Sequence, residues 1–232
     1  MSYRGFVGQR FIVSRVAKGR APFEYPRSMV RVRLCGFAML AVGFYPGYFL
    51  FAQDAGRLTF RTLVSNLLMQ TSPFAKSKPP EDSASVTLPG RLFTPPLVAP
   101  LIERPQADRS TPERAFASMR SANKVNDHAW IVENFVPAER AEIQKMLSDA
   151  SMEKRNQDYY KTIRSAEING TALLRGFTIL LLREETDNGT ARRVPVTLAR
   201  TPSGWMLTNA LSNDSTFDVV FGALRSGTVE KQ

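Results

Sequence analysis

Cysteine and histidine are almost absent from this chain of 232 residues, which holds one of each, Cys35 and His128. A disulfide within the chain is therefore excluded, and a zinc site of cysteine and histidine ligands is not expected. Cys35 lies inside an apolar run, where a free cysteine usually behaves as a small apolar residue. The sequence also lacks a glycine-rich phosphate loop and a G-x-S-x-G elbow. We therefore predict no metal site, no cofactor and no Cys–His catalytic pair.

Basic charge is plentiful but unevenly distributed. The formal net charge is +10, and residues 1–33 supply +7 of it, with eight Lys or Arg against the single acid Glu24. Residues 110–232 carry sixteen basic and fifteen acidic residues and are nearly neutral. The basicity therefore belongs to an N-terminal tail, residues 1–33, and we do not expect the C-terminal region to bind nucleic acid.

Charge is missing altogether from Leu34–Ala52, a run of nineteen residues that as a helix would span about 28 Å. Basic residues precede the run and Asp54 follows it, so the positive-inside rule places the N-terminus in the cytoplasm. Pro46-Gly47 interrupts the run, which membrane helices tolerate. Residues 34–53 are thus predicted to anchor the chain in an inner membrane of the bacterial type, with the C-terminal domain outside the cytoplasm.

Two other interpretations of this run stay open. A signal peptide could begin at Met29 and be cleaved near Ala52, which would release the protein into the periplasm and make residues 1–28 an over-extended start. Against it, Leu50-Phe51-Ala52 is a poor small-x-small cleavage site. A buried core helix of a soluble protein would have the same length, but the basic flank argues against it.

The next two segments are predicted to lie outside the main domain. Within residues 54–70, apolar side chains recur at helical spacing and predict an amphipathic helix that contacts the membrane surface, another chain or the domain; they are Phe60, Leu63, Val64, Leu67 and Leu68. Residues 71–110 contain eight prolines and predict an extended linker, because proline lacks the N–H donor and fixes φ.

Residues 111–225 show helical patterns first and strand patterns afterwards. Thr111-Pro112 and Asp127 have the chemistry of helix starts, and a third helix starts at Pro137. Alternating or apolar runs at 159–168, 176–185, 191–200 and 205–211 predict about four antiparallel strands, and 212–224 a last helix. We expect an α+β fold with helices on one face of a curved sheet, followed by a tail at 226–232.

The order of these elements resembles the nuclear-transport-factor-2-like, or cystatin-like α+β cone, superfamily over residues 110–225. The residues that carry the resemblance are Ala122, Asp127, Trp130 and Phe135 in the helical half and the strand Trp205–Leu211. The resemblance implies a cone-shaped domain of the kind found in isomerases, small-molecule binders and non-catalytic modules. Membrane-anchored members, among them assembly components of type IV secretion systems, share the layout of basic tail, membrane helix and outer domain.

Candidate chemistry is sparse. Isomerase-type members of the superfamily place a carboxylate base in an apolar cavity, and Asp127, His128 and Tyr160 are the weak candidates here, with Tyr159 beside them. Asp127 is expected to cap a helix instead, and His128 would point about 100° away from it. A cavity, if present, would be lined by aromatic side chains: Trp130, Phe135, Tyr160, Phe177 and Trp205.

Two classes of function follow. The first is a non-catalytic, membrane-tethered domain that binds a protein partner or a second copy of itself in envelope assembly. The second is a cone-fold binder of a small molecule, or an enzyme of the ketosteroid-isomerase or cyclase type. A filled interior with an exposed apolar patch would favour the first class, and a deep pocket holding Asp127 or a tyrosine hydroxyl the second.

Overall fold

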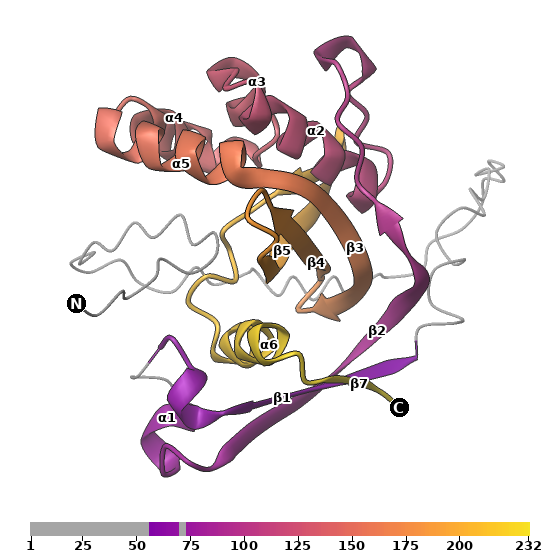
Figure 1. Ribbon diagram of the computed structural model, residues 1–232, viewed down its shortest axis with the longest axis vertical. Coiled ribbons are helices and arrows are strands. Elements are labelled where there is room, and N and C mark those ends of the chain that lie inside the picture. Colours follow the sequence, from indigo (N-terminus) through magenta and orange to yellow (C-terminus); the bar gives the residue numbers. More distant parts are fainter. Residues whose placement is uncertain (1–55, 70–72) are drawn as a thin grey trace, which may run out of the picture. The chain divides into compact units, whose positions relative to one another are not determined.

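The structure is a computed structural model that describes residues 56–69 and 73–232 (Figure 1). The basic tail at 1–33 and the apolar run at 34–53 lie outside the described residues. Within the described part of the chain, no helix is both long enough and apolar enough to cross a membrane.

The strands form one open antiparallel sheet of seven, in the order β6-β5-β4-β3-β2-β1-β7. The predicted α+β class is confirmed, but with seven strands where about four were expected. The strands are β1 (Arg57–Leu63), β2 (Ser83–Val98), β3 (Ile163–Leu174), β4 (Phe177–Thr186), β5 (Ala191–Thr201), β6 (Gly204–Leu207) and β7 (Val229–Lys231).

Four of the six helices, α2, α3, α5 and α6, begin at a capping side chain. Thr111 accepts a hydrogen bond from the Arg114 amide at the start of α2, and Asp214 caps α6 in the same way. Gly227, with a φ of 72°, ends α6 in the left-handed conformation. The helices are α1 (Pro73–Ser77), α2 (Pro112–Lys124), α3 (His128–Glu133), α4 (Arg140–Leu147), α5 (Ala150–Thr162) and α6 (Ser215–Ser226).

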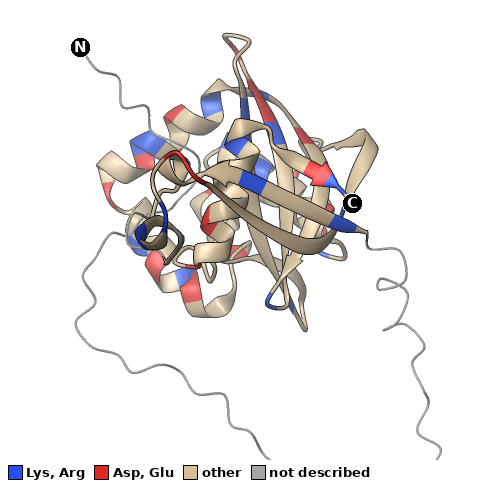
Figure 2. Cartoon of the chain, turned by 90° about the horizontal axis from the view of Figure 1, so that it is seen from below, with Lys and Arg blue, Asp and Glu red and all other residues tan. Residues whose placement is uncertain are grey.

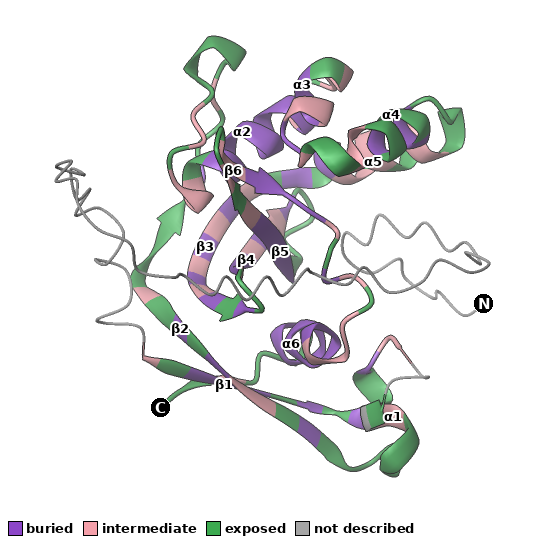
Figure 3. Cartoon of the chain, turned by 180° about the vertical axis from the view of Figure 1, so that it is seen from behind, coloured by how far each residue is buried: buried purple, intermediate pink, exposed green. Residues whose placement is uncertain are grey.

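Helices cover both faces of the central strands, with α2–α5 on one side and α6 on the other (Figure 1). Ile179 and Leu181 of β4 pack in one cluster with Phe217 and Val220 of α6. Successive residues of a strand point to opposite faces, so Leu180, Leu182 and Glu184 face the α2–α5 layer. This explains why β4 is a nearly continuous apolar run whose residues are buried on both sides (Figure 3).

The predicted amphipathic helix at 54–70 is wrong, because residues 57–63 form strand β1. Leu58 and Phe60 are fully buried against α6, whereas Leu63, which the helical stripe would bury, is 47% exposed. Phe60 and Val64 fit both a helical stripe and a strand that alternates, and pairing with β2 and β7 selects the strand for residues 57–63. Only Val64–Asn66 form a short 3-10 turn.

The predicted linker at 71–110 is also wrong over much of its length, since it contains α1 and the sixteen-residue strand β2. Its prolines are tolerated because β2 pairs with β1 only as far as Pro89. Pro95 and Pro96 lie in a bulge between the paired residues Leu92 and Leu97, where β2 makes no ladder bond that needs their N–H.

Two boundaries in the C-terminal half differ from the prediction as well. Residues 150–162 form α5, so Tyr159 and Tyr160, which were expected at the start of a strand, are helical. Strand β3, expected to end at residue 168, continues through Asn169-Gly170. The chain turns at Arg175-Gly176, where both φ angles are positive. The folded unit therefore exceeds residues 111–225: it includes β1 and β2 before them and β7 in the predicted tail.

Candidate functional site

Asp127 is a helix cap, as predicted. One carboxylate oxygen accepts the Trp130 amide at 3.0 Å at the start of α3, and the other contacts the guanidinium of Arg104 at 3.0 Å. Both oxygens therefore have partners near the surface. This arrangement holds the N-terminus of α3 and offers no carboxylate free to act as a base.

His128 does not pair with Asp127. Its Nε2 atom lies 3.0 Å from Oε1 of Glu153 in α5, at an angle that makes no hydrogen bond, so the contact is an ion pair only when the imidazole is protonated. The same oxygen accepts hydrogen bonds from the side-chain amide groups of Asn126 and Gln157. The histidine therefore takes part in a contact between α3 and α5.

The predicted cavity residues Trp130 and Tyr160 are core residues of the helical layer, each 2% exposed. The Trp130 indole donates to the hydroxyl of Ser118 at 3.0 Å, and that hydroxyl donates to Oδ1 of Asn134 at 2.8 Å. The hydroxyl of Tyr160 contacts the sulfur of Met119 at 3.1 Å. These polar groups are used inside the protein and hold α2, α3 and α5 together.

The other three predicted cavity residues lie elsewhere. Phe135 is buried beside Leu207, to which it forms an isolated bridge. Phe177 packs against the cluster on the α6 side of the sheet. Trp205 is half-buried on the edge strand β6, under the guanidinium of Arg200. The five aromatic side chains are thus not gathered around one cavity.

The most unusual polar group is one that the sequence analysis missed, Glu184 of β4. It is 3% exposed and faces the helical layer, where the hydroxyl of Tyr159 from α5 donates a hydrogen bond to its carboxylate. Arg192 is the β5 residue opposite Glu184, and its guanidinium lies 5.2 Å from the ring centre of Tyr159. A buried acid thus joins α5 to the sheet through one tyrosine.

A second guanidinium lies near this pair. Arg120 of α2 is 6% exposed and donates to the backbone carbonyls of Ala99 at 2.7 Å and Arg164 at 3.3 Å. No ion pair joins Arg120 or Arg192 to Glu184 in the part of the chain that the structure describes. The two cations therefore act on the carboxylate at longer range.

Burial raises the pKa of Glu184 above its ordinary value, against the opposing effects of the Tyr159 hydrogen bond and of the Arg192 and Arg120 charges. Burial and the neighbouring carboxylate also raise the pKa of Tyr159, which stays a neutral donor. The arrangement can therefore hold a proton in the interior, which is the property required of a general acid or base.

Metal binding has no support in the described residues, where no group of three or more His, Cys, Asp or Glu side chains could hold an ion. Charged side chains of both signs are distributed over the helices and strands instead (Figure 2).

Comparison with known proteins gives little guidance. No protein-family model matches the chain, and no curated protein does. Among solved structures, the chain is similar to the solution structure of a SEC-C motif containing protein from Rhodopseudomonas palustris, with 18% identity and a TM-score of 0.32. The match covers 43% of this chain and 78% of that one. Similarity at this level does not identify a function.

Proposed function

We propose that this protein is a membrane-tethered, extracytoplasmic and non-catalytic domain of the nuclear-transport-factor-2-like type, which binds a protein partner or a second copy of itself in assembly of the cell envelope. Two properties of the sequence support the tether: the uncharged run Leu34–Ala52 and the basic residues before it. The interior supports a non-catalytic role, because Trp130, Phe135 and Tyr160, three of the aromatic residues expected around a cavity, are packed as core.

The observation that carries the binding role is an exposed apolar segment at the end of β2. Leu97, Val98 and Leu101 are 42%, 71% and 50% exposed. These exposed apolar residues are close together in the chain, and an exposed apolar surface is one sign of a binding site for a protein or a membrane.

The backbone of this segment is held rigidly. The Ala99 amide donates to the Ala166 carbonyl at 2.9 Å, and the Ala99 carbonyl accepts from Arg120 at 2.7 Å. The Ile102 amide donates to the hydroxyl of Ser121 at 2.9 Å. The backbone that carries the apolar side chains is therefore already ordered, so less conformational entropy is lost when a partner binds.

Fractionation with N-terminal sequencing tests the tether. We expect the intact chain in the membrane pellet after a high-pH wash. A soluble form that starts near Gln53 would instead identify a cleaved signal peptide and reject the anchor.

Native mass measurement of the detergent-extracted protein tests the binding role. We expect the paired substitutions Val98→Asp and Leu101→Asp to reduce the mass of the assembly. Leu63→Asp, at a residue of similar exposure on β1, is the matched control. A single-chain mass for the unchanged protein would reject the proposed association.

The second candidate function is a small-molecule binder or enzyme, and the buried Tyr159–Glu184 pair favours it. A proton held in the interior by a carboxyl and a phenol could serve proton transfer next to a carbonyl group. Turnover of an unsaturated ketone that is lost in Glu184→Gln but kept in Glu185→Gln would establish this function.

A further inference from the structure

One face of the sheet near β1 has no helix of the described chain packed on it. The buried residues Leu58, Phe60 and Leu88 face α6. Alternation therefore turns Arg57, Thr59 and Arg61 of β1 to the opposite side. Thr59 shares this side with Thr87 of the neighbouring strand, since their hydroxyls lie 2.9 Å apart, and Thr59 is itself only 8% exposed.

This outer face is basic. Arg57 is paired with Pro89, and Arg91 lies two residues further along β2 on the same face, which places the two arginines diagonally about 7–8 Å apart. Arg61 lies about 13 Å from Arg57 along β1. All three are exposed, and none forms an ion pair with an acid in the described residues. Glu230 of β7, opposite Thr59, is the acidic residue on this side.

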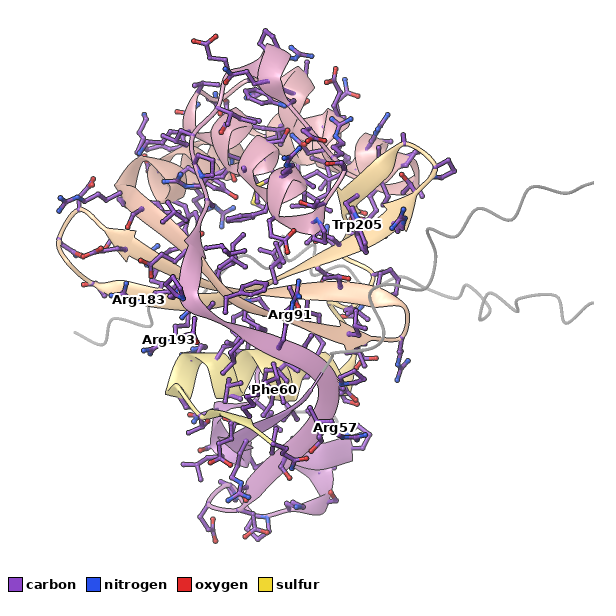
Figure 4. All side chains as sticks on the ribbon, turned by 90° about the vertical axis from the view of Figure 1, so that its right-hand side faces the viewer. Arg57, Phe60, Arg91, Arg183, Arg193 and Trp205 are labelled. Atoms are coloured by element: carbon purple, nitrogen blue, oxygen red, sulfur yellow. The ribbon has the colours of Figure 1, made fainter. Side chains whose placement is uncertain are left out.

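Apolar side chains lie beside Arg91. The guanidinium of Arg91 lies 5.0 Å from the ring centre of Phe93. Leu173 is 45% exposed and follows Ala172, the residue of β3 paired with Gly90. Figure 4 looks onto this side of β2, with Arg57 and Arg91 labelled. We define the outer face by these six residues: Arg57, Arg61, Arg91, Phe93, Leu173 and Thr59.

The position of this face in the chain indicates its ligand. Four residues, Gln53 to Gly56, separate the uncharged run ending at Ala52 from Arg57. Even when fully extended, this connection spans at most about 17 Å. If the run lies in a bilayer, β1 begins within that distance of the lipid headgroups.

We propose that the outer face of β1–β3 binds the surface of the same membrane that anchors the chain, with its arginines on anionic phospholipid headgroups and with Leu173 and Phe93 at the interface. This inference rests on the proposed tether. Cations interspersed with apolar and aromatic side chains are the composition of interfacial membrane-binding surfaces. A nucleic acid would contact the same cations, but the short connection keeps this face next to lipid.

Spin labelling of the full-length chain in vesicles tests the inference. A Leu173→Cys label in a Cys35→Ser background reports on the outer face, and a Val125→Cys label, 66% exposed in the unchanged chain, reports on the surface of the helical layer. The vesicles contain phosphatidylcholine alone or an equal mixture with phosphatidylglycerol. We expect the Leu173 label to be shielded from a water-soluble relaxation agent and accessible to oxygen only in the mixed vesicles, and the Val125 label to stay in water in both.

Charge reversal provides the second test. Each arginine near an anionic surface favours binding by about fivefold, so Arg57→Glu with Arg91→Glu should lower the equilibrium constant for docking by about 25-fold or more. Lys145→Glu with Lys161→Glu, two exposed lysines of the helical layer, is the matched control. If the reversal impairs folding by circular dichroism, Arg57→Gln with Arg91→Gln replaces it.

The outcomes separate the two proposals. A Leu173 label that stays in water while the protein remains in the vesicle pellet would overturn the lipid face and leave the tether intact. Protein washed off the vesicles at high pH would overturn both. Spin–spin broadening at Leu173, which requires a second copy on this face, would also overturn the lipid face.

Discussion

The hydroxyl of Tyr159 donates a hydrogen bond to the carboxylate of Glu184, and this contact joins α5 to β4 in the interior of the protein. Few of the buried groups in the described chain carry a formal charge, and Glu184 has no ion-pair partner there. A buried carboxyl without a paired cation is destabilising when it is ionised. The stability of the domain should therefore depend on the protonation of Glu184.

Glu184→Gln should make the domain less sensitive to alkaline pH. The pKa of Glu184 is raised in the folded state, so the folded protein binds this proton more tightly than the unfolded chain does. The resulting stabilisation is fully present below the ordinary value of 4.5 and is lost as the pH rises through the raised value. Thermal unfolding from pH 5 to pH 9 should show a smaller loss of Tm in the variant.

Glu185→Gln is the control for this prediction, because Glu185 is the next residue of β4 and points to the other face. An equal change in pH dependence for both variants would show that the effect does not come from the buried site.

Tyr159→Phe should lower the free energy of unfolding by about 1–3 kcal/mol at neutral pH, since it removes the donor from a buried carboxylate.

Asp127→Ala should destabilise the domain by about 1 kcal/mol, the usual cost of losing a helix N-cap. Asp127→Asn keeps an acceptor for the Trp130 amide and loses only the ion pair with Arg104, a partly exposed contact that contributes about 0–1 kcal/mol. Urea denaturation of the two variants checks the order. Equal losses would mean that the charge of Asp127 matters more than the cap.

Ser118→Ala should destabilise the domain more than its small change in volume suggests. The serine hydroxyl accepts from Trp130 and donates to Asn134, so its removal leaves two buried polar groups without this partner. Each costs about 1–3 kcal/mol when it is left unsatisfied. Denaturant titration followed by Trp fluorescence measures the change, with Ser203→Ala at an exposed turn as control. A loss below about 1 kcal/mol for Ser118→Ala would contradict the prediction.

Gly170→Ala should disrupt the junction of β2 and β3. A Cβ atom at Gly170 would lie 2.3 Å from the carbonyl oxygen of Arg91, and one at Gly90 would lie 2.5 Å from that of Thr171. Backbone atoms cannot move aside as a side chain can, so we expect a loss of about 1–3 kcal/mol. Gly56→Ala, whose added Cβ would make an ordinary contact at 3.6 Å, should be nearly neutral. Thermal unfolding of Gly170→Ala, Gly90→Ala and Gly56→Ala checks this, and an equal Tm for all three would contradict the prediction.

Helix starts were predictable from the sequence because capping is local. Thr111-Pro112 and Asp127 stand within three residues of the amides that they satisfy or precede, and no distant contact is needed. The general α+β class followed from the change in the spacing of apolar residues, which is helical in the first half of residues 111–225 and alternating or continuous in the second. These features do not depend on which strands pair.

The N-terminal part of the sheet was not predictable in the same way. Phe60, Val64 and Leu67 fit a helical stripe, and the choice of a strand at 57–63 depends on β2, β7 and α6, two of which lie more than 150 residues away. Prolines argue against a central strand. Strand β2 tolerates three of them because its pairing with β1 ends at Pro89 and its pairing with β3 bulges at Pro95 and Pro96. Long-range pairing of this kind overrides local propensity.

The buried acid could not be singled out from the strand pattern. Glu184 lies on the same side of β4 as Leu180 and Leu182, but Glu185 lies on the same side as Ile179 and Leu181, and all four apolar residues are buried. The partner of Glu184 could not be identified, because Tyr159 was assigned to a strand and its true helix has few apolar residues to reveal it.

The packing of α6 on β1 also sets an order of events during synthesis. The apolar residues Leu58 and Phe60 leave the ribosome long before Ser215, where the helix that covers them begins. Until then the apolar face of β1 stays uncovered, even after β2 has paired with the strand, and exposed apolar surface of this kind favours aggregation when folding depends on contacts between distant parts of the chain. The core on this side of the sheet therefore closes only when one of the last helices of the chain is made.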